Sequence, residues 1–245
     1  MPVRPKRPVV IGVAAVLAVL VAGAGSLAYR FLGADEPAEA ALTSPSPSAS
    51  VTGSSTPVDD PGFDGAWSID VQTGSIRDGS ASFAGYRIEE ELGGVGANTA
   101  VGRTQGVAGS LSIAGTDVTA LDVTVDMTTL TSDDERRDDQ LAARGLETDT
   151  FPTATFALTE PITIGEAPTI GEAISSAATG DLTLHGVTRP VDVAIQAQWT
   201  GTHIEVVGRL EVALADYDIE PPVGFLVLSI ADTGTIELHL LFAQG

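Results

Sequence analysis

The chain of 245 residues contains no cysteine, and its 33 acidic and 12 basic residues give a formal net charge of −21 at pH 7. The lack of cysteine excludes disulfides, thiolate nucleophiles, cysteine-ligated zinc and the acylated cysteine of a lipoprotein. All acidic residues lie from Asp35 onward. Because such an acidic surface repels nucleic acid and anionic membrane, neither is expected as a partner of that part of the chain.

An uncharged apolar run occupies residues 9–28, after the basic residues Arg4, Lys6 and Arg7. As a helix it would span roughly 30 Å, the thickness of the hydrocarbon layer of a bilayer. The basic residues favour a cytoplasmic N-terminus. We expect residues 1–33 to form a cytoplasmic stub and a single transmembrane anchor, with the rest of the chain outside the cell membrane. The alternative is a signal peptide cleaved near residues 22–24, which would release a secreted protein.

Residues 34–62 are rich in Ser, Pro, Thr and Ala and contain almost no large apolar side chain. Such a segment cannot bury enough surface to offset its ordering entropy, so we expect a disordered linker. The folded domain is then expected to occupy residues 63–245.

Within this domain the hydrophobic pattern is that of β-strands. Leu121, Val123 and Val125 alternate with polar residues, as in a strand with one apolar face. The same period of two recurs within residues 182–184, 191–199, 210–214 and 236–242. Short strands separated by Gly, Pro, Asp and Thr clusters predict an all-β antiparallel barrel or sandwich.

One segment predicts a short helix instead. Ser132 and Glu135 have the spacing of a capping box, and Gly145 stands where a C-cap is expected. We therefore expect a helix over residues 133–144, with Leu141 pointing inward.

Two glycine-rich stretches, residues 93–102 and 165–180, predict loops. In a barrel such loops often surround the opening, where binding takes place.

The sequence carries no nucleophile elbow, zinc-protease helix, P-loop or dinucleotide fingerprint. His185, His203 and His239 lie on three different predicted strands, where hydrogen-bonded or surface roles are commoner than a zinc site. The acidic run of residues 133–139 lacks the spacing of a calcium loop and predicts a solvated helix face. Paired carboxylates for glycoside chemistry leave no signature, but 12 aromatic residues are few for a glycan cleft. We expect no enzyme, no metal and no cofactor.

Several short motifs occur in order along the domain. They are WSID at 67–70, FAGYRI at 83–88, RD at 137–138 with Leu141, FPTATF at 151–156, GDLTLHGVTR at 180–189 and DYDI at 216–219. Together they resemble the YceI-like family of lipid-binding proteins over residues 67–242. Many members of that family are soluble periplasmic proteins, whereas this chain carries an apparent anchor and linker.

The resemblance implies a lipocalin-like, eight-stranded antiparallel barrel with one short helix, which holds a polyisoprenoid, quinone-like or similar long-chain lipid without catalysis. Because some members pair, it also admits a homodimer. The alternating residues are then expected to form the cavity wall, with three phenylalanines as further contributors. These residues are Phe83, Leu121, Val123, Val125, Phe151, Phe156, Val193, Ile195, Leu210, Val212, Leu238 and Leu240.

Other motif residues are expected to hold the barrel together. Gly186 should permit a tight turn, and Arg137 with Asp138 should attach the helix to the end of a strand. Asp70 or Arg87 is a candidate for contact with a polar headgroup at the rim. The alternative to a ligand cavity is a barrel filled by its own side chains, which would make this an interaction or structural domain of the cell envelope.

Overall fold

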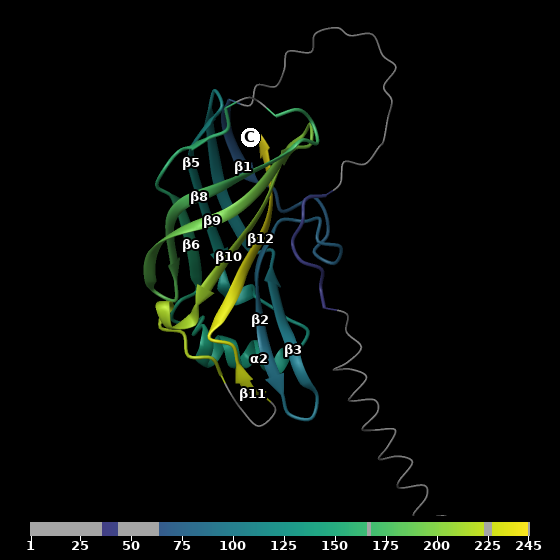
Figure 1. The fold of residues 1–245 in the computed structure, drawn as a ribbon, viewed down its shortest axis with the longest axis vertical. Coiled ribbons are helices and arrows are strands. Elements are labelled where there is room, and N and C mark those ends of the chain that lie inside the picture. Colours follow the sequence, from purple (N-terminus) through teal and green to yellow (C-terminus); the bar gives the residue numbers. More distant parts are fainter. Residues whose placement is uncertain (1–35, 44–63, 166–167, 223–226, 245) are drawn as a thin grey trace, which may run out of the picture.

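The computed structural model describes residues 36–43, 64–165, 168–222 and 227–244 (Figure 1). Its strands are β1 (Gly65–Ile69), β2 (Phe83–Leu92), β3 (Gly96–Thr104), β4 (Val107–Ala114), β5 (Asp117–Asp126), β6 (Thr153–Leu158), β7 (Ile162–Thr163), β8 (Ala173–Leu184), β9 (Val187–Trp199), β10 (His203–Ala213), β11 (Val227–Ile230) and β12 (Thr233–Gln244). The helical segments are α2 (Glu135–Gln140) and three shorter turns, η1 (Met127–Thr129), η2 (Leu141–Gly145) and η3 (Leu214–Tyr217).

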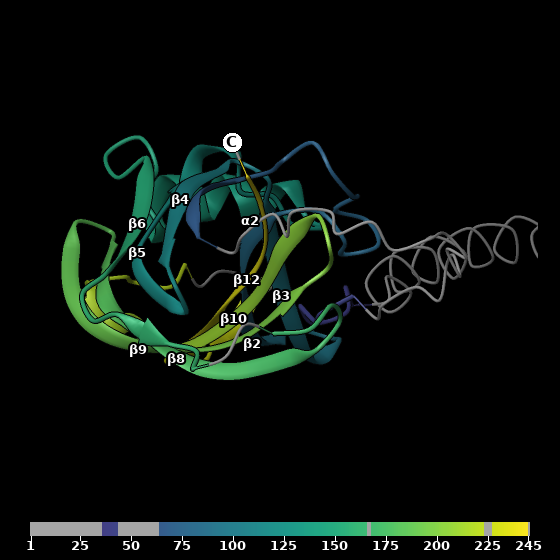
Figure 2. The ribbon, with the colours of Figure 1, turned by 90° about the horizontal axis from the view of Figure 1, so that it is seen from above.

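Eight strands close into a barrel around a common axis, in the order β1-β4-β5-β6-β8-β9-β10-β12 (Figure 2). All of their pairings are antiparallel, and β12 pairs with β1 to complete the ring. The ladder between β10 and β12 runs from His203 opposite Ala243 to Ala213 opposite Thr233. Closure pairs the edges of these eight strands with one another, which protects them from edge-to-edge aggregation. The predicted eight-stranded barrel with one short helix is confirmed.

The wall is extended at the end of the barrel where α2 lies. There β12 leaves β1 and pairs with β2, from His239 opposite Phe83 to Thr235 opposite Arg87. Strand β2 in turn pairs with β3 and with β11. These added strands lie beside α2 (Figure 1).

Both predicted glycine-rich loops are partly strand: residues 96–102 of the first and residues 173–180 of the second. Within residues 93–102 only a short turn separates β2 from β3, and Gly102 lies opposite Tyr86. A Cβ atom at Gly102 would lie 2.3 Å from the Tyr86 ring, so this glycine makes room for an aromatic side chain. Within residues 165–180 strand β8 begins at Ala173. The prediction failed because the small residues there satisfy their backbone groups by pairing with β9.

The helix is shorter than predicted and begins with a different cap. The side chain of Asp134 accepts a hydrogen bond from the Arg136 amide and caps α2. Ser132 does not cap the helix, because its hydroxyl donates to the Asp138 carboxylate over 2.6 Å. After Gln140 the chain continues as the π-helical turn η2.

The turn between β8 and β9 consists of His185 and Gly186, with φ angles of +50° and +75°. Two consecutive left-handed residues suit the twist of a two-residue hairpin. The tight turn expected at Gly186 is confirmed, and a Cβ atom there would also lie 2.6 Å from the Phe151 ring.

Residues 36–43, which we call the strap, lie against the outer wall of the barrel (Figure 1). This range falls within the predicted disordered linker, yet Ala40 is buried in a small cluster with Phe83 and Val207. The predicted anchor at residues 9–28 and the rest of the linker lie outside the described residues. Among the residues that the structure does describe, no helix has the length and apolar character needed to cross a bilayer.

Candidate functional site

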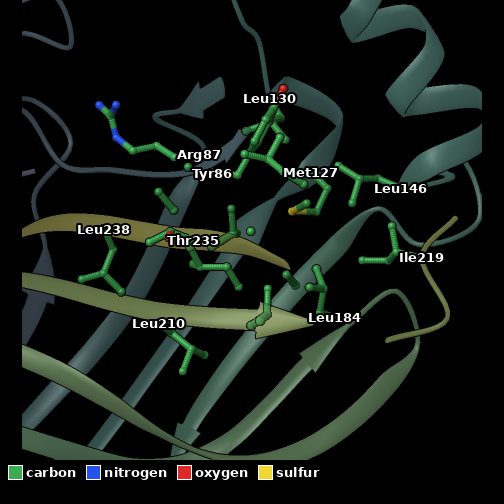
Figure 3. A pocket seen from close by; sticks show the side chains of 18 of the residues that line it. Tyr86, Arg87, Met127, Leu130, Leu146, Leu184, Leu210, Ile219, Thr235 and Leu238 are labelled. Atoms are coloured by element: carbon green, nitrogen blue, oxygen red, sulfur yellow. The ribbon is translucent and has the colours of Figure 1, made fainter. Parts of the chain in front are cut away.

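An apolar cavity of about 300 Å³ occupies the end of the barrel nearest α2. Its wall comes from β5, β6, β8, β9, β10 and β12, together with β2. On β10 the lining residues Val206, Gly208, Leu210 and Val212 occupy alternate positions, because every second side chain of a strand shares one face. Side chains such as Leu184, Leu210 and Leu238 surround the space in Figure 3. The volume lies at the lower limit of typical ligand pockets.

Ten of the twelve predicted wall residues line this cavity. They are Leu121, Val123, Val125, Phe156, Val193, Ile195, Leu210, Val212, Leu238 and Leu240. The structure thus places the alternating faces of β5, β9, β10 and β12 on the inside.

Phe83 and Phe151 lie elsewhere. Phe83 is fully buried on the outer side of β2, where the strap covers it and the Arg103 guanidinium stands 4.3 Å from its ring centre. Phe151 packs against His185 at the β8–β9 turn, with 4.4 Å between the ring centres. Both were expected inside as large apolar side chains. That criterion does not distinguish the two faces of β2, which is buried on both, and Phe151 lies before β6 and outside any strand.

The sequence reasoning missed part of the wall. Leu182 and Leu184 showed the alternating pattern but were not assigned to the cavity, which they line with Ala178. Met127, Leu146 and Ile219 also line it but lie outside regular strands. No periodic signal marks such residues.

A second hollow of about 120 Å³ lies toward the opposite end of the barrel. It shares Leu121, Ile195, Val206 and Phe242 with the larger cavity, so the two spaces adjoin within one apolar interior. Trp199 lines this second hollow and meets Trp67 edge to face, with 5.6 Å between ring centres. A chain-like ligand that entered the larger cavity could extend along this axis.

Polar side chains gather where the larger cavity meets α2. Arg137 forms ion pairs with Glu90 on β2 at 2.7 Å and with Asp133 at 2.6 Å. The first contact attaches the helix to the end of β2, as expected for Arg137. Asp138 accepts hydrogen bonds from Ser132 and so fixes the segment before the helix.

On the outer wall a group of charged residues is buried. Glu237 accepts hydrogen bonds from Arg87 Nε at 2.9 Å and Arg103 Nε at 2.8 Å, and from the backbone amide of Ala40 in the strap. Glu237 has no solvent exposure. Because a buried charge is costly unless it is paired, this carboxylate and the two guanidinium groups stabilise one another only as a set.

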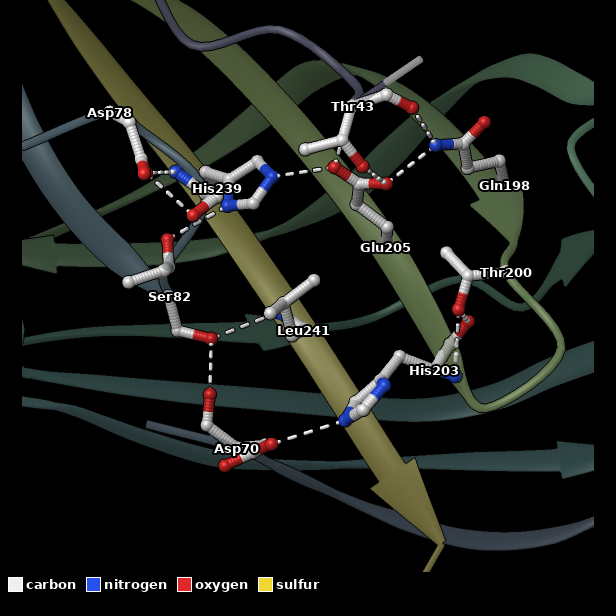
Figure 4. Close-up of polar contacts among 12 residues, drawn as sticks. Thr43, Asp70, Asp78, Ser82, Gln198, Thr200, His203, Glu205, His239 and Leu241 are labelled. Atoms are coloured by element: carbon white, nitrogen blue, oxygen red, sulfur yellow. Dashed lines mark hydrogen bonds and ion pairs between the residues drawn. The ribbon is translucent and has the colours of Figure 1, made fainter. Parts of the chain in front are cut away.

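Glu205, also without exposure, forms a second buried group, shown in Figure 4. It accepts hydrogen bonds from His239 Nε2 at 2.7 Å, Gln198 Nε2 at 2.5 Å and the Thr43 amide at 2.7 Å. Burial acts to raise the pKa of Glu205, but these hydrogen bonds outweigh it and leave the pKa lowered.

The three histidines are separated and hydrogen-bonded. His185 Nδ1 donates to the Tyr217 carbonyl oxygen over 3.0 Å, and His239 Nδ1 donates to the Ala81 carbonyl oxygen over 2.8 Å. His203 Nε2 lies 3.1 Å from the Asp70 carboxylate. The structure places no metal-binding cluster of His, Asp or Glu within the residues it describes.

Asp70 and Arg87 were predicted to contact a lipid headgroup, but neither has an unpaired charge that faces the cavity. Asp70 does not line it, and its pKa is lowered by hydrogen bonds from Thr73 and Gln72 and by the contact with His203. Arg87 borders the cavity, but its guanidinium binds Glu237 and Glu36 on the outer side.

The fold and the cavity define a closed antiparallel barrel with a hollow apolar interior, an architecture suited to one small apolar ligand. The profile of the YceI-like domain matches residues 67–242, and the chain belongs to that family. The family resemblance of the sequence motifs is therefore confirmed.

The similar proteins agree with this assignment. A UPF0312 protein of Vibrio parahaemolyticus is 29% identical over 127 residues, which span 49% of this chain and 60% of that protein. Two solved structures share the fold. A polyisoprenoid binding domain from Saccharophagus degradans, implicated in plant cell wall breakdown, is 19% identical with a TM-score of 0.57, over 73% of this chain and 98% of that one. BcnA of Burkholderia cenocepacia is 17% identical with a TM-score of 0.51, over 65% of this chain and 95% of that one.

Proposed function

We propose that this protein binds one long-chain lipid, a polyisoprenoid or a similar amphiphile, inside the barrel and catalyses no reaction on it. The cavity of about 300 Å³, with its aliphatic wall and its adjoining second hollow, is the observation that carries this proposal. Burial of each CH₂ group contributes about 0.8 kcal/mol. A long chain would nominally exceed the practical limit of about 20 kcal/mol, so the cost of ordering it must offset much of this and permit release.

The comparisons support the same ligand class. The polyisoprenoid binding domain of Saccharophagus degradans shares the barrel topology over nearly its whole length. The inward alternation of β5, β9 and β10 gives this chain an apolar interior of its own.

We also propose that the barrel works outside the cytoplasm. The support is the apolar run of residues 9–28 and the basic residues before it. If residues 9–28 anchor the chain, the full-length protein should sediment with membranes, and external protease should release the barrel. A mature chain that begins near residue 25 and stays in the soluble fraction would show cleavage instead.

The central test is mass spectrometry of lipids extracted from the full chain purified from its native host. Val123, which is 7% exposed on the inner face of β5, is changed to aspartate, which places an unpaired charge in the cavity. The matched control is Thr124→Asp, at the exposed neighbouring position on the same strand. The inner variant should lose its lipid, and the outer variant should keep it.

A second, uncharged variant tests the cavity even if Val123→Asp does not fold. Ala178→Phe places a larger side chain at a lining position and should lower the lipid load by occupying the cavity. A native protein that carries no lipid, or a folded Val123→Asp variant with the wild-type load, would refute the proposed function.

A further inference from the structure

One side chain of the cavity carries a hydrogen-bonding group that no described residue uses. The hydroxyl oxygen of Tyr86 is buried and has no hydrogen-bond partner among the residues that the structure describes. Tyr86 lines the larger cavity, near Leu130 and Met127 in Figure 3. Buried tyrosine hydroxyls almost always find a partner, so an unused one on a residue that lines a cavity points to a partner that arrives with the ligand. The hydroxyl has almost no accessible surface, so the ligand reaches it by displacing the side chains packed beside it.

The position of this hydroxyl is fixed by packing. The Tyr86 ring lies over Gly102 on the paired strand β3, where an added Cβ atom would approach ring carbons to 2.3 and 2.9 Å. The glycine therefore lets the ring lie flat against β3. A hydroxyl held in place before binding loses little entropy when it forms a bond.

The charges nearby favour an uncharged partner. Apart from burial, the positive charge of Arg137 lowers the pKa of the Tyr86 hydroxyl. The three carboxylates of Glu90, Asp133 and Asp138 raise it. Arg137 is already paired with Glu90 and Asp133. Because these carboxylates outnumber the arginine that acts on the hydroxyl, the field at the Tyr86 oxygen itself favours an uncharged partner, although Arg136 also borders the cavity.

The hydroxyl is suited to donate. Burial raises the pKa of Tyr86 well above its ordinary value, so the proton stays in place at neutral pH. An O–H group without a partner can then complete its bonding with an alcohol or carbonyl oxygen.

We propose that Tyr86 donates a hydrogen bond to an uncharged oxygen at the head of the bound lipid. This inference rests on the proposed function and adds an orientation to it. The polar head lies beside α2, at the end where Arg137 and Gln140 border the cavity. The chain extends toward the second hollow and Trp199.

The test compares ligands that differ only at the head. Delipidated full-length protein is titrated with geranylgeraniol, with the corresponding hydrocarbon and with geranylgeranyl diphosphate, and binding is followed by calorimetry and tryptophan fluorescence. Tyr86→Phe removes only the hydroxyl. We expect it to weaken alcohol binding about three- to tenfold, the range of one neutral hydrogen bond, and to leave hydrocarbon binding unchanged.

Tyr217→Phe is the matched control. Its hydroxyl is also buried without a partner in the described part of the chain, but Tyr217 does not line the cavity. It should alter the binding of none of the three ligands.

The outcomes separate the two proposals. Equal effects of Tyr86→Phe on alcohol and hydrocarbon, or no effect on either, would overturn the role of Tyr86 while leaving lipid binding intact. Tighter wild-type binding of the diphosphate than of the alcohol would overturn the uncharged head. Failure of every ligand to bind the wild-type protein would overturn the proposed function as well.

Discussion

Replacing Glu237 with glutamine keeps the shape of the side chain and removes its charge. In the folded protein this carboxylate has no exposure and contacts the guanidinium groups of Arg87 and Arg103 at 2.9 and 2.7 Å. Arg87 retains Glu36 as a second partner, but Glu36 lies at the surface, with 47% of its side chain exposed. Arg103 has no second carboxylate partner among the ion pairs of the described residues. The substitution therefore leaves a buried guanidinium without a counter-charge.

The expected loss of stability follows from the burial of the guanidinium group that loses its partner. Removal of one partner from a buried ion pair typically costs about 3–5 kcal/mol, because the other charge stays buried and unpaired. Glutamine retains one acceptor oxygen, so we expect the lower end, about 3 kcal/mol of the free energy of unfolding. For a domain of this size that corresponds to a fall of roughly 6–12 °C in the unfolding midpoint.

Equilibrium unfolding in urea, followed by circular dichroism, measures the difference. The matched control is Glu39→Gln, which removes a strap carboxylate paired with Arg209 at the surface, where both side chains are partly exposed. The control should change the midpoint little, because exposed pairs contribute little. A Glu237→Gln variant as stable as this control would show that water or another arrangement already compensates the buried guanidinium groups, and the reasoning would be wrong.

Three further expectations concern single positions. Because the pKa of Glu205 is lowered from 4.5, its carboxylate stabilises the fold above that pH, and this contribution disappears as the pH falls below it. Glu205→Gln should therefore unfold more easily than wild type at pH 7, with the difference shrinking in acid; a gap that is constant with pH would contradict this. Gly186→Ala should cost more in thermal unfolding than Gly79→Ala, because both have φ of +75° but only the former brings a Cβ atom against Phe151; equal costs would mean that strain alone matters. Ala40→Glu should detach the strap, because Ala40 is 5% exposed, and amide exchange in residues 36–43 should rise at least tenfold; unchanged protection would argue against docking.

The alternation of apolar and polar residues, with a period of two, predicted much of the fold. The alternation of Leu121, Val123 and Val125 identified both β5 and its inner face, because only one face of that strand is dry. The signal failed on β2, where Phe83 is buried on the outside and Ala84 faces inward. A strand covered on both faces shows no alternation, so its inner side cannot be assigned from sequence.

The outer polar group was beyond sequence reasoning for a related reason. Glu205 and Glu237 occupy outward positions of their strands and have the pattern of solvated residues, yet neither is exposed. The strap that covers them lies more than 150 residues away along the chain. The composition of residues 36–43 gives no sign of docking, because these residues are held mainly through backbone groups that every sequence possesses.

The strap also determines where mechanical force enters the molecule. A pull on the chain ahead of residue 36 reaches the strap before it reaches β1, whose pairing with β12 closes the barrel at Trp67. The load falls first on the bonds from Arg87 to Glu36 and to the Pro37 carbonyl and from Arg103 to the Ala38 carbonyl, and only then on the contacts of Ala40 and Thr43. Rupture of these contacts would detach the strap from the outer wall before the barrel strands bear the load. In a single-molecule pulling experiment the strap should detach at low force while the barrel stays folded.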